Sequence, residues 1–168
     1  MTKPISRDEL RGISFLQLIC LYVNRAGDLA IEPKQIKLDS VTRLEGGNVR
    51  VKISPERITG WTNGPIEVII PPVEVDKVYD ETVIDWQDIQ GKTLEEVLKI
   101  AALPPPLPTR VEVEEYDMLY PGAELKLKYR LTYTNAFFVG ETIVRISGAP
   151  NNLDSLAVLN TLFIRAEQ

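Results

Sequence analysis

Histidine is absent from this chain, and cysteine occurs once, as Cys20. Histidine is the commonest general base near neutral pH and the commonest metal ligand, so its absence removes the most frequent catalytic and metal-binding arrangements. A lone cysteine can form neither an intrachain disulfide nor a thiolate zinc cage, and it has no histidine to activate it. Cys20 lies in an apolar helical pattern and is interpreted as a reduced core residue. We therefore expect no catalytic residues, no cofactor, no metal ion and no enzymatic activity.

Long apolar runs and broad basic surfaces are also missing. The longest apolar stretch, Ile13 to Val23, is interrupted by Ser14 and Gln17 and is too short to span a bilayer. No secretory signal is evident, and Gly46-Gly47 has no helix after it that could cradle a phosphate. A net charge of −5 argues against binding nucleic acid through a wide basic face. Neither a membrane nor a nucleic acid is expected as a partner.

What is present is a composition that can fill a core. Of the 168 residues, 44% are hydrophobic and 26% are charged, as in soluble globular proteins. This length is enough for one domain of ordinary size or for two small ones.

The second half of the chain repeats the apolar pattern of the first at a constant offset of 76 residues, as from Val49 to Leu125. The other matched positions are Val51 and Leu127, Ile53 and Tyr129, Trp61 and Phe137, Val68 and Val144, and Ile70 and Ile146. The repeated positions are those of a core, and few polar positions recur, so the pattern indicates a duplicated scaffold. It favours a structural building block.

The first half predicts one helix and three strands. Ser6 and Glu9 have the spacing of a capping box, which predicts a helix from about 7 to 26, closed by a left-handed Gly27. Strands are expected at 35–41, 48–54 and 65–70, because apolar residues there alternate with polar ones or lie between turn residues.

The second half repeats this order after an acidic connector at 73–91. Thr93 and Glu96 form a second capping box, which opens a helix that reaches Ala102. Extended segments follow at 111–113, 123–133 and 140–147, and Tyr129 and Tyr133 are expected on the core side of the longest strand. The apolar segment after Asn152 has no counterpart in the first half and could form a helix or a strand.

These elements predict an α+β fold of two related modules, each a helix packed on a small antiparallel β-sheet. The predicted boundaries are 1–79 for the first module, 80–150 for the second, and 151–168 for a C-terminal docking segment.

Two groups of side chains are candidates for binding a partner. One group is the apolar side of the docking segment, namely Leu153, Leu156, Leu159, Leu162 and Phe163. The other is a basic strip shared by matching strands, namely Arg50, Lys52, Lys126, Lys128 and Arg130. The strip is interpreted as an exposed polar face that resists edge-to-edge aggregation, or as a contact for an acidic partner surface. A nucleic-acid groove would carry aromatic residues on the same face, and here they fall on the opposite one.

Two further features have a structural and a functional interpretation. The acidic residues of the connector, such as Asp76 and Asp85, fit a solvated linker better than a calcium loop, because the spacing of a loop site is missing. Trp61 and Phe137 stand just before matching strands, as core residues or as platforms for stacking a sugar.

The segments NVRVKI and ITGWTNGPIEVII, preceded by a helix, resemble a module that recurs in virion structural proteins of large tailed bacteriophages. The second half, with TLEEVL, a proline-rich loop and ELKLKYRLTYTNAFFVGETIVRI, is similar to the partner module of such proteins. The resemblance covers about residues 8–146. It implies a structural role in the particle and no catalytic residues.

Together these patterns predict a virion protein that is assembled in the host cytoplasm and acts by protein–protein assembly, at the tail, the baseplate, a fibre attachment or the capsid surface. Its expected partners are other virion proteins and copies of itself. The alternative is a module that binds carbohydrate or a host surface through Trp61 and Phe137.

Overall fold

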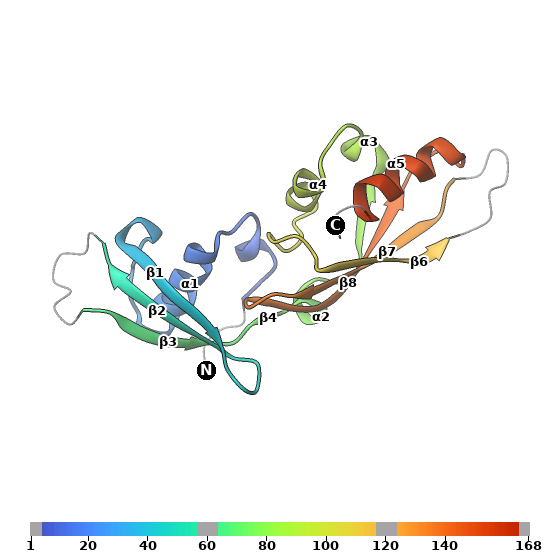
Figure 1. Cartoon of the computed structure of the whole chain (residues 1–168). Helices are drawn as coiled ribbons and strands as arrows, with labels where there is room; N and C mark the ends of the chain where they lie inside the picture. Colours follow the sequence, from blue (N-terminus) through green and yellow to red (C-terminus); the bar gives the residue numbers. More distant parts are fainter. Residues whose placement is uncertain (1–4, 57–63, 117–123, 165–168) are drawn as a thin grey trace.

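The computed structural model describes residues 5–56, 64–116 and 124–164. The chain forms an elongated molecule of two lobes, each built on one sheet (Figure 1). Helices and antiparallel strands occur in both, and the larger sheet also contains parallel pairs, so the protein is of the mixed α+β class.

The first lobe is a helix on a three-stranded antiparallel sheet of order β1-β2-β3. Its elements are η1 (Asp8–Leu10), α1 (Phe15–Gly27), η2 (Pro33–Gln35), β1 (Ile36–Arg43), β2 (Val49–Pro55) and β3 (Ile66–Ile70). Val49, Val51 and Ile53 alternate with Arg50 and Lys52 along β2 and are fully buried, which confirms the predicted alternation. The apolar face of this sheet packs beneath α1 (Figure 1).

The first helix is shorter than predicted. The Ser6 amide does donate to the Glu9 carboxylate at 2.9 Å, but only a 3-10 turn follows, because Gly12 turns the chain at φ +64°. A second capping box, Ser14 with Gln17, starts α1. The left-handed residue at its C-terminal end is Asp28, at φ +51°, and not Gly27.

The second lobe contains a five-stranded mixed sheet in which β4, β8, β7 and β6 are neighbours in that order and β5 also pairs with β8. Its elements are β4 (Val73–Glu74), α2 (Val75–Val78), β5 (Thr82–Asp85), α3 (Trp86–Ile89), α4 (Leu94–Ile100), β6 (Arg110–Tyr116), β7 (Leu127–Thr134), β8 (Phe138–Ser147) and α5 (Leu153–Ile164). The Thr93–Glu96 capping box of α4 is as predicted. Tyr129 and Tyr133 are fully buried, which confirms the predicted inward face of β7.

The acidic segment 73–91 is part of this sheet, so its interpretation as a solvated linker is wrong. β4 and β5 lie parallel to β8 at successive stretches of that strand, and α2 passes between them over Gly140. Apolar residues alternate with the acidic ones here, and Val73, Val75 and Ile84 are buried. The carboxylates remain outside while the valines and isoleucines anchor the segment.

The two lobes are joined by one continuous hydrophobic core and by specific polar contacts. The Arg7 guanidinium, from the first lobe, donates to the carbonyl oxygens of Ala101 and Ala102 and to the Thr82 hydroxyl, at 2.9, 3.2 and 2.8 Å. The Phe15 and Phe137 rings lie 5.0 Å apart across the same junction. These contacts fix one lobe against the other.

Both halves contain a helix followed by a three-stranded antiparallel meander, α1 with β1-β2-β3 and α4 with β6-β7-β8. In each meander the first strand has an irregularity, after Leu38 in β1 and after Val113 in β6. The registers of the later strands differ. Val51 pairs with Val68, whereas Leu127, 76 residues after Val51, pairs with Ile146 and not with Val144.

Candidate functional site

The outer face of the second sheet is a network of opposite charges. The Arg130 guanidinium lies 2.6 Å from a Glu114 carboxylate oxygen and 3.7 Å from one of Glu141. Lys128 stands directly opposite Arg145 on the neighbouring strand, a repulsive arrangement by itself. Glu81 offsets it, because its carboxylate lies 3.8 Å from the Lys128 ammonium and 3.5 Å from the Arg145 guanidinium.

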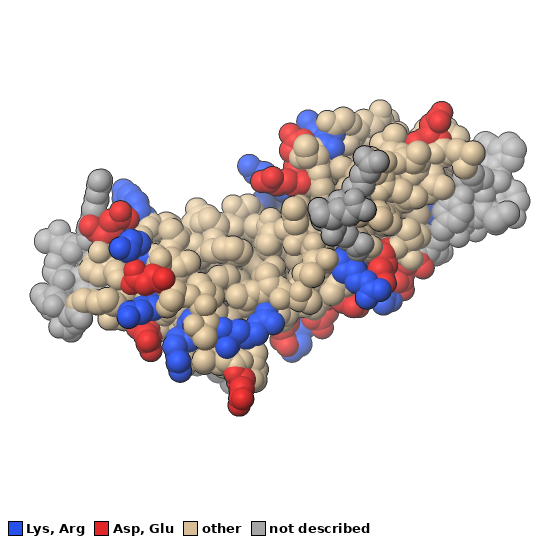
Figure 2. Space-filling model, in the orientation of Figure 1, with Lys and Arg blue, Asp and Glu red and all other residues tan. Residues whose placement is uncertain are grey.

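The predicted basic strip is therefore not one cationic surface. Arg50 and Lys52 lie on the first sheet, and the Arg50 guanidinium is 3.9 Å from a Glu67 carboxylate oxygen. Lys126, Lys128 and Arg130 lie on or next to β7 in the other sheet. Figure 2 shows acidic and basic side chains interspersed on the first lobe and a largely uncharged surface at the middle of this face. The basic residues of the predicted strip have carboxylates beside them, as in an exposed polar face of mixed charge.

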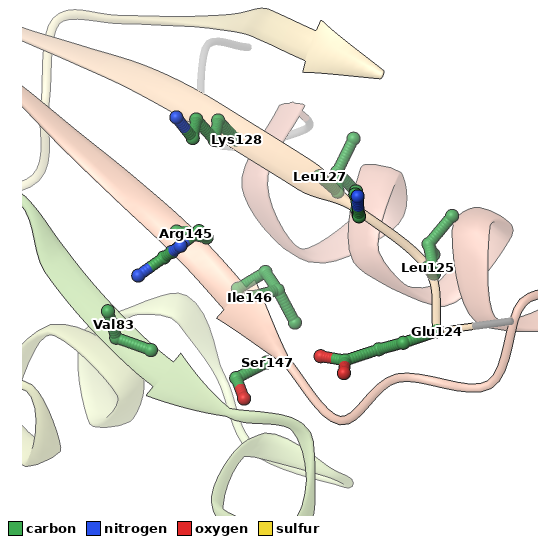
Figure 3. A pocket seen from close by; sticks show the side chains of 9 residues that line it. Val83, Glu124, Leu125, Leu127, Lys128, Arg145, Ile146 and Ser147 are labelled. Carbon is green, nitrogen blue, oxygen red and sulfur yellow. The ribbon is translucent and has the colours of Figure 1, made fainter. Parts of the chain in front are cut away.

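A pocket of about 480 Å³ lies at the end of this charged face, between β5, β8 and the start of β7 (Figure 3). Lys126, Lys128 and Arg145 line it together with Val83 and Ser147. Its one lining carboxylate, Glu124, accepts a hydrogen bond from the Gly148 amide at 2.6 Å. The described walls thus offer positive charge and a hydroxyl, while their carboxylate is held by the backbone.

The C-terminal segment forms the helix α5, which packs on the inner face of its own sheet. Leu159 and Phe163 are fully buried, and the Phe163 ring stacks on Tyr129 with centroids 4.5 Å apart. The Tyr129 hydroxyl donates to Asn160 Oδ1 at 2.7 Å. As contacts for a partner, Leu159 and Phe163 were predicted wrongly, since the chain itself already covers them.

The other predicted residues of α5 are more accessible. Leu153 is 70% exposed, Leu156 is half-buried, and Leu162 lines an apolar pocket of about 370 Å³ with Val158 and Ile89. Removing the segment from Asn152 onward would uncover the inner face of β7. Because Leu159 and Phe163 are part of the core, such a truncation should destabilise the fold.

The structure tests the predicted sugar-stacking role for only one of the two matched aromatic residues, Trp61 and Phe137. Trp61 lies outside the described residues. Phe137 is 3% exposed and packs against Phe15, so it is a core residue and cannot stack on a sugar.

The strand edges carry a feature that we did not foresee. Four strands at the margins of the sheets each have a large aliphatic side chain exposed to solvent: Val41 on β1, Ile69 on β3, Val83 on β5 and Val113 on β6. The two-residue strand β4, also at a margin, has none, because its Val73 is buried. Ile69 is the most exposed of them, at 56%. Ile69 lies two residues after Glu67 and therefore on the same outer face of β3. An apolar residue at a position where the alternation calls for a polar one could have revealed this feature from the sequence.

The buried tyrosines are the most strongly perturbed titratable groups that the structure describes. Burial raises the pKa of Tyr79 to about 12, and burial together with the nearby Tyr79 raises the pKa of Tyr133. The described residues include no cluster of acidic or cysteine side chains that could hold a metal ion. None of the described helices is long and apolar enough to cross a membrane.

Neither a family model, nor a curated protein, nor a solved structure matches this chain.

Proposed function

We propose that this chain is a non-enzymatic structural subunit of a tailed-bacteriophage virion and that it acts by binding copies of itself and neighbouring virion proteins. The observation that carries the proposal is the exposed aliphatic side chain on the marginal strands of both sheets. Soluble proteins usually protect such edges with charges, prolines or irregular pairing, because an open edge can pair with another chain. An edge that keeps an exposed valine or isoleucine is suited to assembly.

The arrangement of the halves supports a duplicated module as the origin of this architecture. Helix and meander follow in the same order in each half, with an irregular first strand both times. The registers differ by two residues, and a shift of two keeps every side chain on its face. A duplicated core could thus survive while its strands slid relative to one another.

The test is the protein content of purified particles. Virions of the phage that encodes this chain, banded on a density gradient and analysed by quantitative mass spectrometry, should contain the chain in a fixed ratio to the major capsid protein. Treating the particles with nuclease and high salt separates built-in subunits from adsorbed protein. A chain that is found only in the infected-cell lysate, or that the salt wash removes, would refute the virion role.

A further inference from the structure

We infer that β3 is a self-association edge, which pairs antiparallel with β3 of a second copy about a two-fold axis. The result would be one six-stranded sheet across the two first lobes. This inference rests on the proposed assembly role and assigns it a particular strand and partner.

The edge of β3 is open in the described structure. Among the described residues, β2 is the only strand paired with β3, which forms the margin of its sheet (Figure 1). All five residues of β3 pair with β2 without irregularity. On the core side, Ile66 and Val68 remain half-buried although Ile70 is covered. A strand paired with the open edge of β3 would bury the Ile66 and Val68 side chains further than α1 does.

The sequence of β3 is complementary to itself when the two strands run antiparallel and Val68 lies on the axis. In that register Ile66 faces the second copy's Ile70 and Val68 faces its own equivalent, so the core side is aliphatic throughout. On the outer side, Glu67 faces the second copy's Ile69. No two like charges stand opposite each other, and Glu67 keeps its own neutralising partner, since Arg50 lies 3.9 Å away.

The remaining margins are less suited to pairing with themselves. β6 contains Glu112 and Glu114, and its register is broken after Val113. β1 is broken in the same way after Leu38. β5 has four residues and ends at Asp85. Irregular pairing, several acidic charges and very short length are usual means by which an edge is protected. β3 pairs regularly over its five residues and carries one carboxylate, Glu67, which has Arg50 as its partner; its prolines flank the strand and lie outside it.

The register can be tested with two charges at one position. Ile69→Glu would place a carboxylate opposite the second copy's Glu67 at both ends of the pair, and we expect the dissociation constant to rise by about ten-fold. Ile69→Lys would place an ammonium there, so association should be retained or tightened. Sedimentation equilibrium of the purified full chain at several concentrations measures both.

The stability of the single chain should respond in the opposite sense, which makes these variants controls for each other. Ile69 pairs with Arg50 on β2, so within one copy Ile69→Glu is the favourable charge and Ile69→Lys the unfavourable one. Weaker association of Ile69→Glu with an unchanged or raised melting temperature cannot come from misfolding. If both variants weaken association equally, the register centred on Val68 is wrong. If the unsubstituted chain is a monomer at every concentration, the whole inference is overturned.

Cross-linking gives an independent readout of the same edge. Val68→Cys should give a covalent dimer with a short bis-maleimide, because side chains directly opposite in an antiparallel pair have Cβ atoms about 4.5–5.5 Å apart. Cys20 is 4% exposed, so the introduced thiol is the accessible one. Val41→Cys and Val113→Cys place the thiol on the other margins and should remain monomeric. Equal cross-linking of all three variants would contradict an assignment to β3.

The two proposals can fail separately. A β3 dimer of a protein that is missing from virions would refute the virion role and leave the edge assignment standing. A virion protein that neither dimerises nor cross-links through β3 would do the reverse.

Discussion

Tyr129 and Tyr133 occupy the same face of β7, and both are fully buried, but their hydroxyl groups differ in bonding. The Tyr129 hydroxyl donates to Asn160 Oδ1, whereas the Tyr133 hydroxyl has no hydrogen-bond partner among the described groups. A buried polar group without a partner costs about 1–3 kcal/mol, while a typical satisfied bond contributes about 1 kcal/mol. The two residues are therefore a matched pair for measuring this difference in one protein.

Replacing each tyrosine by phenylalanine should shift stability in opposite directions. Tyr133→Phe removes the unpaired hydroxyl, and we expect the free energy of unfolding to rise by about 1 kcal/mol. Tyr129→Phe breaks the bond to Asn160 and leaves its carbonyl oxygen unpaired, so a fall of about 1–2 kcal/mol is expected. Urea denaturation at neutral pH measures both. A loss of stability in Tyr133→Phe would show that its hydroxyl is satisfied in solution.

At the scale of single elements, Arg7 is the most consequential polar contact between the lobes. It donates to the carbonyl groups at the C-terminal end of α4, where the last helical carbonyls have no partner within the helix. It also bonds the Thr82 hydroxyl at the start of β5, and its guanidinium lies 5.3 Å from the centre of the Tyr79 ring. One side chain thus supplies hydrogen bonds to carbonyl groups at the end of α4 and connects the first lobe to the second.

Arg7→Ala should lower the free energy of unfolding by about 2–3 kcal/mol, because charged hydrogen bonds to partly buried carbonyl groups are lost. Arg7→Lys should recover only a small part, since a single ammonium group cannot reproduce the planar fork of donors. Arg11→Ala is the matched control: its pair with Asp8 spans 3.9 Å between exposed side chains, so its loss should change stability by less than about 0.5 kcal/mol. Equal effects of Arg7→Ala and Arg11→Ala would show that the hydrogen bonds of Arg7 to the second lobe do not stabilise the fold.

The sequence predicts strands and helix caps correctly where neighbouring residues determine them. Examples are the alternating apolar residues of β2 and β7 and the Thr93 capping box. Prediction failed where distant residues decide. Two parts of the acidic segment 73–91 form the strands β4 and β5 because they pair with the edge of β8, and α5 packs inward, where Phe163 stacks on the Tyr129 ring. Ion pairs across strands such as that of Glu81 with Arg145 depend on the pairing of β5 with β8, which no local spacing reveals.

At the scale of the whole molecule, the described residues form one continuous core. Because this core contains buried tyrosines, the stability of the protein should depend on pH in the alkaline range. Tyr79 and Tyr133 lie in this cluster, and burial favours their neutral form. A raised pKa means that the folded state holds the proton more tightly than the unfolded chain. The stabilisation is complete below the unfolded value near pH 10 and is lost as pH rises toward 12.

We therefore expect the free energy of unfolding to fall steeply above pH 10. Tyr79 alone should contribute about 2–3 kcal/mol of this fall, at about 1.4 kcal/mol per unit of pKa shift. Tyr79→Phe has nothing to ionise at that position, so its stability should decline less steeply over the same range. Thermal unfolding of both proteins, followed by circular dichroism from pH 9 to 12, measures the difference. Parallel curves would show that the Tyr79 hydroxyl reaches solvent, and that the junction between the lobes is less tightly closed than its contacts indicate.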